Sequence, residues 1–188
     1  RLISYAKNGT LLDLTDLLAT SDLPMDKYMP SALDQYRWAA GDFDSGNPDG
    51  AYYGIPSDAQ AQVFVYNKKM FDAAGVPYPT DDWTWDDMLD AAKKLTIPEK
   101  EQYGFYIDPM LIWKGIWTKA AGGSVISPDY KKSMLTAPET AEAITWLWDA
   151  IWKHKVAIPP PPPNSNQPFL DRKVAMTCPE LIDVMATK

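Results

Sequence analysis

The sequence predicts an α/β protein, rich in helices and with short strands, whose length suits either one good core or two small lobes. Two apolar stretches, residues 52–55 and 63–66, have the β-branched and aromatic composition of buried strands. A polar segment, residues 57–62, joins them. Several stretches farther along the chain combine helical apolar spacing with helix start and stop signals. The two strands form either an ordinary hairpin or a crossover between lobes whose polar residues face the gap.

The first fifty residues predict helices and one polar loop. Residues 2–7 are predicted as a helix, and residues 30–38 as a second helix with proline in its first turn. Residues 41–50 form an acidic loop that invites comparison with a calcium-binding EF-hand. Asn47 and Tyr53 stand where that motif requires glycine and glutamate, so a solvated loop is favoured over a metal site.

The clearest helix signals follow the second strand. Asn67 is predicted to cap a short helix that ends at Gly75. Thr84 and Asp87 form a capping box that begins an amphipathic helix over residues 85–95.

Further elements are predicted in the second half. A strand at residues 103–105 precedes a helix from Asp108 to Gly122. Thr136 and Glu139 form a second capping box. The helix after it is expected to bury four apolar side chains: Ile144, Leu147, Trp148 and Ile151. Five consecutive prolines, residues 159–163, predict a rigid extended connector or, alternatively, a segment that another protein recognises.

Composition narrows the function classes. The net charge is −7 and the lysines and arginines form no basic stripe, which argues against nucleic-acid binding. One cysteine, Cys178, permits neither an intrachain disulfide nor zinc spacing. The eight tryptophans and ten tyrosines suit either large cores or surfaces that stack on sugars.

Catalytic and cofactor motifs are missing. The one histidine, His154, lies between two lysines near a helix end, a poor setting for a nucleophilic triad. The sequence contains no dinucleotide fingerprint, P-loop or HExxH motif, so we expect neither cofactor nor metal. A glycoside hydrolase needs only two carboxylates, and that class therefore stays open.

Several short groups of residues occur in an order that resembles a known family. They are Tyr53-Gly54-Ile55-Pro56, Val65-Tyr66-Asn67-Lys68, Phe71, Ala74-Gly75 and Trp85-Asp86-Asp87-Met88. This set is similar to extracellular solute-binding proteins of ABC importers, and most similar to the sugar-binding branch with the maltose- and trehalose-binding proteins. The resemblance is densest over residues 52–96 and extends loosely from residue 9 to residue 176.

The resemblance implies a periplasmic-binding-protein fold of class II. Residues 1–58 would be the end of the first lobe, residues 59–62 the hinge crossover, and residues 63–188 most of the second lobe. The opening strands of such a first lobe and the family's closing helices are not evident, so the chain is expected to be a fragment.

The resemblance also implies a function. The expected protein is no enzyme but a monomer outside the cytoplasm, either periplasmic or a cell-surface lipoprotein. It would capture a mono- or oligosaccharide reversibly between its lobes and deliver it to the permease subunits of an ABC importer. The alternatives are a sugar-active enzyme fragment such as a glycoside hydrolase, a binding protein for a non-sugar solute, and a sensor or adhesin that no longer transports.

Three polar residues of the crossover are candidate ligand contacts. Asp58, Gln60 and Gln62 alternate, so an extended backbone would place them on one side. The resemblance puts Gln60 nearest to the acid or amide that accepts sugar hydroxyls in the family. The alternative is that these side chains only satisfy the local backbone.

Three tryptophans complete the candidate site. The resemblance suggests that Trp113 and, less directly, Trp117 face the cleft and stack on a sugar, with Trp38 contributing from the first lobe. Core packing is the alternative for each of them. Residues 169–176 are similar to a late F-x-x-G-K-x-A-M strand of the family, with Arg172 in place of the glycine.

Overall fold

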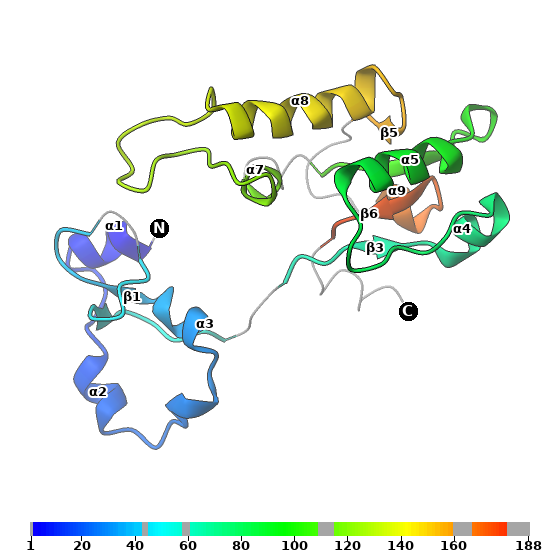
Figure 1. The fold of residues 1–188 in the computed structure, drawn as a ribbon. Coiled ribbons are helices and arrows are strands. Elements are labelled where there is room, and N and C mark those ends of the chain that lie inside the picture. The colour runs from blue at the N-terminus through cyan, green and yellow to red at the C-terminus, as the bar shows by residue number, and fades with distance from the viewer. Residues whose placement is uncertain (1, 43–44, 58–60, 109–114, 160–166, 180–188) are drawn as a thin grey trace. The chain divides into compact units, whose positions relative to one another are not determined.

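The computed structural model describes residues 2–42, 45–57, 61–108, 115–159 and 167–179. Contacts within the chain divide it into two compact units, Arg1–Ala59 and Gln60–Lys188. Each unit has its own sheet, shown as arrows in Figure 1.

Unit 1 is built from short helices around a two-stranded sheet. Strand β1 (Arg37–Trp38) pairs antiparallel with β2 (Ala51–Tyr52), with Trp38 opposite Ala51. The helices of the unit are α1 (Leu2–Lys7), α2 (Thr15–Ala19), η1 (Met25–Lys27) and α3 (Pro30–Asp34). The helix predicted over residues 2–7 is therefore confirmed.

The helix predicted over residues 30–38 is wrong in its second half. Helix α3 ends at Asp34, and Trp38 belongs to a strand instead. The cause is tertiary: Gly50 approaches the backbone of Trp38 so closely that a Cβ atom there would lie 2.6 Å from the Trp38 carbonyl carbon. Because Gly50 has no side chain, β2 can pair with Arg37 and Trp38, which the local sequence pattern places in a helix. Strand β2 also ends at Tyr52, short of the predicted residues 52–55.

Unit 2 contains a mixed four-stranded sheet with the order β3-β6-β4-β5. Strand β6 (Val174–Thr177) lies between β3 (Val65–Tyr66), which is antiparallel to it, and β4 (Tyr103–Tyr106), which is parallel to it. Strand β5 (Ala157–Ile158) pairs parallel with β4. The predicted strand at residues 103–105 is confirmed. Of the late segment, residues 169–176, the first two belong to helix α9 (Gln167–Leu170) and the last three to strand β6.

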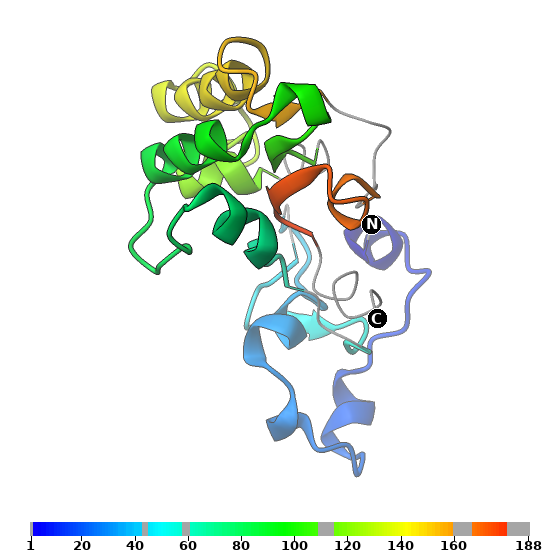
Figure 2. The same ribbon diagram turned by 90° about the vertical axis from the view of Figure 1, so that its right-hand side faces the viewer.

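Helices cover this sheet. Figure 2 shows α5 (Trp85–Leu95), α7 (Ile116–Ala120) and α8 (Pro138–Trp152) stacked on one side of β6. Helix α4 (Lys68–Ala74) follows β3, and η2 (Pro98–Lys100) precedes β4. Of the helix predicted from residue 108 to residue 122, residues 109–114 lie outside the described part, and so do residues 160–163 of the proline run.

The local helix signals are confirmed. The Asn67 side chain accepts a hydrogen bond from the Met70 amide, and α4 ends at Gly75 in the left-handed conformation, with φ of 62°. Thr84 and Asp87 form the complete capping box of α5. These caps satisfy amide groups that have no partner inside the helix.

The start and the buried face of α8 differ from the prediction. Pro138 occupies the first helical position, so the residue before it is extended, and the N-cap falls on Ala137 without a side-chain cap. Thr140 then fixes the rotation of the helix through two hydrogen bonds to the backbone of Ser124. Leu147 and Ile151 are buried as predicted, but Ile144 and Trp148 are 36% and 62% exposed.

The core of unit 2 depends on a close contact between α5 and β4. The position of a Cβ on Gly104 would overlap the backbone of Ala92, and the Gly104 amide donates to Thr96 Oγ1 at 3.0 Å. Phe71, Leu95 and Phe105 are each at most 1% exposed around this contact.

We expect Gly104→Ala to destabilise the chain by about 1–3 kcal/mol, because the added methyl group forces α5 away from the sheet. Urea denaturation followed by far-UV circular dichroism measures this loss. Lys94→Ala on the exposed face of α5 is the control and should change stability by less than about 0.5 kcal/mol. A Gly104→Ala protein as stable as the control would contradict the contact.

The capping box also predicts a pH dependence. Hydrogen bonds from the Thr84 side chain and backbone hold the pKa of Asp87 below its ordinary value. Because the folded pKa is the lower one, this stabilisation is complete above about pH 4 and is lost as the pH falls through the folded pKa. Urea melts should therefore show Asp87→Asn less stable than the parent at neutral pH, with the difference narrowing in acid. An equal difference at both pH values, or the same behaviour in Asp86→Asn, would contradict this.

Candidate functional site

Half of the predicted ligand contacts lie within the described residues. Asp58, Gln60 and Trp113 fall outside them, and their roles stay predictions. The structure describes Trp38 in unit 1, and Gln62 and Trp117 in unit 2.

Trp38 is held inside unit 1 by both its ring and its indole nitrogen. The residue is 7% exposed, and its ring packs against Tyr53 with 6.0 Å between the ring centroids. Its Nε1 donates to the Asp42 carbonyl oxygen at 3.1 Å. The hydrogen-bonding group of Trp38 is therefore used by the protein's own backbone.

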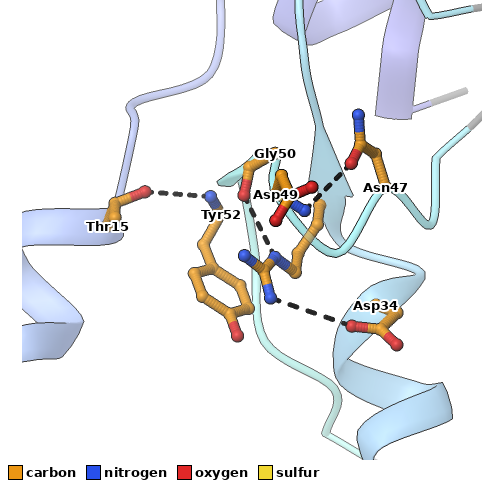
Figure 3. Close-up of polar contacts among 7 residues, drawn as sticks. Thr15, Asp34, Asn47, Asp49, Gly50 and Tyr52 are labelled. Atoms are coloured by element: carbon orange, nitrogen blue, oxygen red, sulfur yellow. Dashed lines mark hydrogen bonds and ion pairs between the residues drawn. The ribbon is translucent and has the colours of Figure 1, made fainter.

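The strands beside Trp38 are stabilised by a polar network around Arg37. Arg37 Nε donates to the Gly50 carbonyl at 3.0 Å, and its guanidinium carbon lies 4.7 Å from the centroid of the Tyr52 ring. The Tyr52 amide donates in turn to Thr15 Oγ1 at 3.1 Å, which links α2 to β2 (Figure 3). These contacts join the sheet to its helices.

The described part of the acidic loop, residues 41–42 and 45–50, hydrogen-bonds within itself and to the backbone just before it. Asp42 Oδ2 accepts from the Ala39 amide and from Asn47 Nδ2. Asn47 Oδ1 accepts from the Asp49 amide at 2.9 Å (Figure 3). Among the described residues no group of three or more histidine, cysteine, aspartate and glutamate side chains could hold a metal ion.

One hollow of unit 2 is lined by several aromatic side chains. It has a volume of about 350 Å³ and lies where the start of α5 meets β3, β6 and α7. This volume falls within the range of small-molecule sites. Its main walls are Phe64, Trp83, Trp85, Met88, Trp117 and Cys178. We refer to this hollow as the aromatic cavity.

Trp117 links the aromatic cavity to the core. Its ring packs edge-on with Trp85 and Phe105, at centroid distances of 5.7 and 5.6 Å, and stacks on Trp146 at 6.1 Å. Trp117 is 7% exposed. The surrounding rings occupy most of its surface, and the part that lines the cavity is what a ligand could reach.

Polar atoms without partners occur at and near this cavity. Trp117 Nε1 and Trp146 Nε1 are buried and have no hydrogen-bond partner among the described residues. Gln62 Oε1 is also buried and without a hydrogen-bond partner among the described residues, and Gln62 lies two residues before Phe64, which lines the cavity. A buried polar atom left unpaired costs about 1–3 kcal/mol, so water or a ligand group is expected to satisfy it.

The chemistry of the aromatic cavity favours binding over catalysis. None of its lining residues in the described part carries an acidic or basic side chain. Burial raises the pKa of the Cys178 thiol to about 12, so this thiol stays protonated at neutral pH and is not nucleophilic. The cavity offers aromatic faces and hydrogen-bonding groups but no proton donor or acceptor suited to bond cleavage.

The sequence did not single out Phe64 or Trp83 as walls of a cavity, and it assigned Trp85 to the core. In the structure Trp85 both packs on the core and lines the cavity. The sequence feature that could have indicated an aromatic cavity is the pair of tryptophans at positions 83 and 85, beside the start of a helix.

Comparison with known proteins relates this geometry to a family. Residues 1–177 match the family described as bacterial extracellular solute-binding protein. An arabinooligosaccharide-binding protein of Halalkalibacterium halodurans is 30% identical over 144 residues, which cover 72% of this chain and 29% of that protein. A maltotriose-binding protein of Pyrococcus abyssi is 26% identical over 150 residues, which cover 80% of this chain and 29% of that protein.

A solved structure supports the same relationship. An ABC substrate-binding protein of Listeria monocytogenes, in complex with cycloalternan, superposes with a TM-score of 0.80 at 31% identity. The match covers 95% of this chain and 45% of that chain. The chain thus spans less than a third of the curated relatives and under half of the solved one. The predicted fold class, a partial two-lobe periplasmic-binding-protein fold, is confirmed.

We expect Trp117→Ala to destabilise the chain by roughly 3–5 kcal/mol, because it removes the ring that three other aromatic side chains contact. Chemical denaturation measures the loss. Trp148→Ala is the matched control: this tryptophan is 62% exposed, and its removal should cost less than about 0.5 kcal/mol. Similar losses in both variants would contradict a central packing role for Trp117.

Proposed function

Because this chain belongs to the bacterial extracellular solute-binding protein family, we propose that it forms part of the substrate-binding component of an ABC importer. It binds a mono- or oligosaccharide reversibly and delivers it to the membrane permease. The protein acts as a monomer outside the cytoplasm, in the periplasm or as a cell-surface lipoprotein. Within the described residues no helix is long and apolar enough to cross a membrane.

The observation that carries this proposal is the aromatic cavity without charged walls. A sugar ring has an apolar face of C–H groups, which packs on aromatic rings, and a rim of hydroxyls, which need hydrogen bonds. Phe64 is 39% exposed and offers a ring surface at this cavity. An uncharged ligand enters such a cavity without the cost of removing an ion from water.

Two of the predicted contacts supply complementary hydrogen-bonding groups. Trp117 Nε1 is a donor and Gln62 Oε1 an acceptor, and both are buried and unpaired. We assign each to a sugar hydroxyl. Asp58, Gln60, Trp113 and Trp38 are retained in the proposed site on the basis of the resemblance, with residues 59–62 as the hinge on which the lobes close.

The names of the three proteins compared above favour a sugar. Two curated relatives are named for oligosaccharides, and the Listeria protein was solved with cycloalternan. Other curated relatives are named for sn-glycerol-3-phosphate, which is the non-sugar alternative. The competing assignment, a sugar-active enzyme, requires two carboxylates facing the substrate. None of the described residues that line the aromatic cavity carries a carboxylate.

A sugar panel tests the proposal. Thermal unfolding is measured with arabino- and malto-oligosaccharides, cyclic glucans and single sugars, and each ligand is analysed afterwards. We expect one or more sugars to raise the melting temperature and to be recovered unchanged. Cleavage of the sugar would replace the proposal with a hydrolase. A shift with peptides, polyamines or metal ions alone would retain a binding protein and reject sugar.

A pair of variants then tests the aromatic cavity itself. Phe64→Ala should weaken binding of the sugar found in the panel by about tenfold, because a stacking surface is lost. Trp148→Ala removes an exposed aromatic ring that does not line the cavity and should leave the affinity unchanged. Equal effects in titration calorimetry would move the sugar site elsewhere on the protein.

A further inference from the structure

Unit 2 has a second hollow, which we call the basic groove. Its volume is about 490 Å³, and it shares no lining residue with the aromatic cavity. It lies between the start of α4, η2 and the turn that joins α9 to β6. The residues used in the argument below are Lys68, Lys69, Lys100 and Arg172.

The walls of the basic groove carry positive charge only. Four of its lining side chains are cationic at neutral pH, and none of the described residues that line it is acidic. The side chains of Lys69, Lys100 and Arg172 make no ion pair or hydrogen bond with the described residues. Lys68 contacts an aromatic face, with Nζ 5.7 Å from the centroid of the Tyr78 ring. The groove therefore concentrates four positive charges without an internal counter-charge.

Three other lysines of unit 2 pair with carboxylates: Lys93 with Asp90 at 2.9 Å, Lys153 with Asp149 at 3.0 Å and Lys173 with Glu101 at 3.2 Å. Further described lysines, such as Lys94 and Lys119, make no ion pair either, so what distinguishes the basic groove is the gathering of four cations around one hollow. In a chain with a net charge of −7, this gathering is a local reversal of charge, which favours an anionic ligand.

Arg172 adds a backbone argument. Its φ is 59°, in the left-handed region that glycine adopts most readily. Glu101, Tyr130 and Lys155 also have positive φ, but of these four residues only Arg172 lines the groove. Backbone strain of this kind is one feature of functional sites. The arginine side chain suits phosphate better than lysine does, because its guanidinium group offers two parallel N–H donors to two phosphate oxygens.

We propose that the basic groove binds a phosphate-bearing anion, with Arg172 as the bidentate partner and Lys69 and Lys100 as neighbouring charges. This site is independent of the sugar site, since the two hollows share no residue. The phosphate comes either from a soluble anion or from the headgroup of an anionic lipid. Both sources present the same group to the groove.

Two binding experiments distinguish these sources. Isothermal titration of the 188-residue chain with inorganic pyrophosphate, at low ionic strength, measures binding of a soluble anion. Co-sedimentation with phosphatidylglycerol vesicles, compared with phosphatidylcholine vesicles, measures binding to a lipid headgroup. We expect saturable binding in one of these arms, and the arm that responds identifies the source. Binding in neither arm would overturn the proposal.

Two variants locate the site. Arg172→Gly removes one positive charge and supplies the residue that the backbone favours, so the melting temperature should stay the same or rise while the affinity falls about tenfold. Lys100→Gln should weaken binding in the same direction. Lys93→Gln removes an equal charge outside the groove and should leave the affinity unchanged. An equal loss in Lys93→Gln would reduce the effect to net charge and overturn the site.

Discussion

The aromatic cavity depends on the position of strand β6. This strand is buried along its whole length and pairs with β3 on one side and β4 on the other. Its pairing brings Cys178, just beyond the strand, beside Phe64, which lies more than a hundred residues earlier in the chain. Without β6, β3 would have no strand partner in the described sheet. The walls of the aromatic cavity are therefore assembled by long-range pairing and not by a local motif.

The aromatic cavity borders a cluster of rings packed edge to face. Trp117 meets Trp85 at 71° and Phe105 at 86° between ring planes, arrangements that aromatic quadrupoles favour. Trp85 and Trp117 belong both to this cluster and to the lining of the cavity. The indole nitrogens of Trp117 and Trp146 are buried in the same cluster without partners. Some of the rings that stabilise the core thus also border the cavity, and two indole N–H groups of the cluster have no partner among the described residues.

The sequence predicted local features well and long-range features poorly. The caps at Asn67 and Thr84 were predictable because each satisfies backbone amides within three residues of itself. Trp38 was placed in a helix because the approach of Gly50 to its backbone is invisible to local periodicity. The helical spacing of apolar residues places Trp148 in the core, but the structure exposes it. The rotation of α8 is set by two hydrogen bonds between Thr140 and Ser124, and because these residues are sixteen positions apart, local spacing does not reveal the contact.

The basic groove is likewise assembled by long-range contacts. The sequence shows no basic stripe, because Lys69, Lys100 and Arg172 are far apart in the chain and meet only through folding. The aromatic cavity and the basic groove differ in how much free energy it costs to move an anion into them from water. The aromatic cavity is apolar, so an anion entering it would lose hydration without an opposite charge to replace it. The basic groove offers opposite charges and remains open to water, so an anion can bind there while part of its hydration is retained. The two proposed sites therefore select different ligands. The apolar walls of the aromatic cavity disfavour an anion, and the cations of the basic groove favour an anion over a neutral sugar.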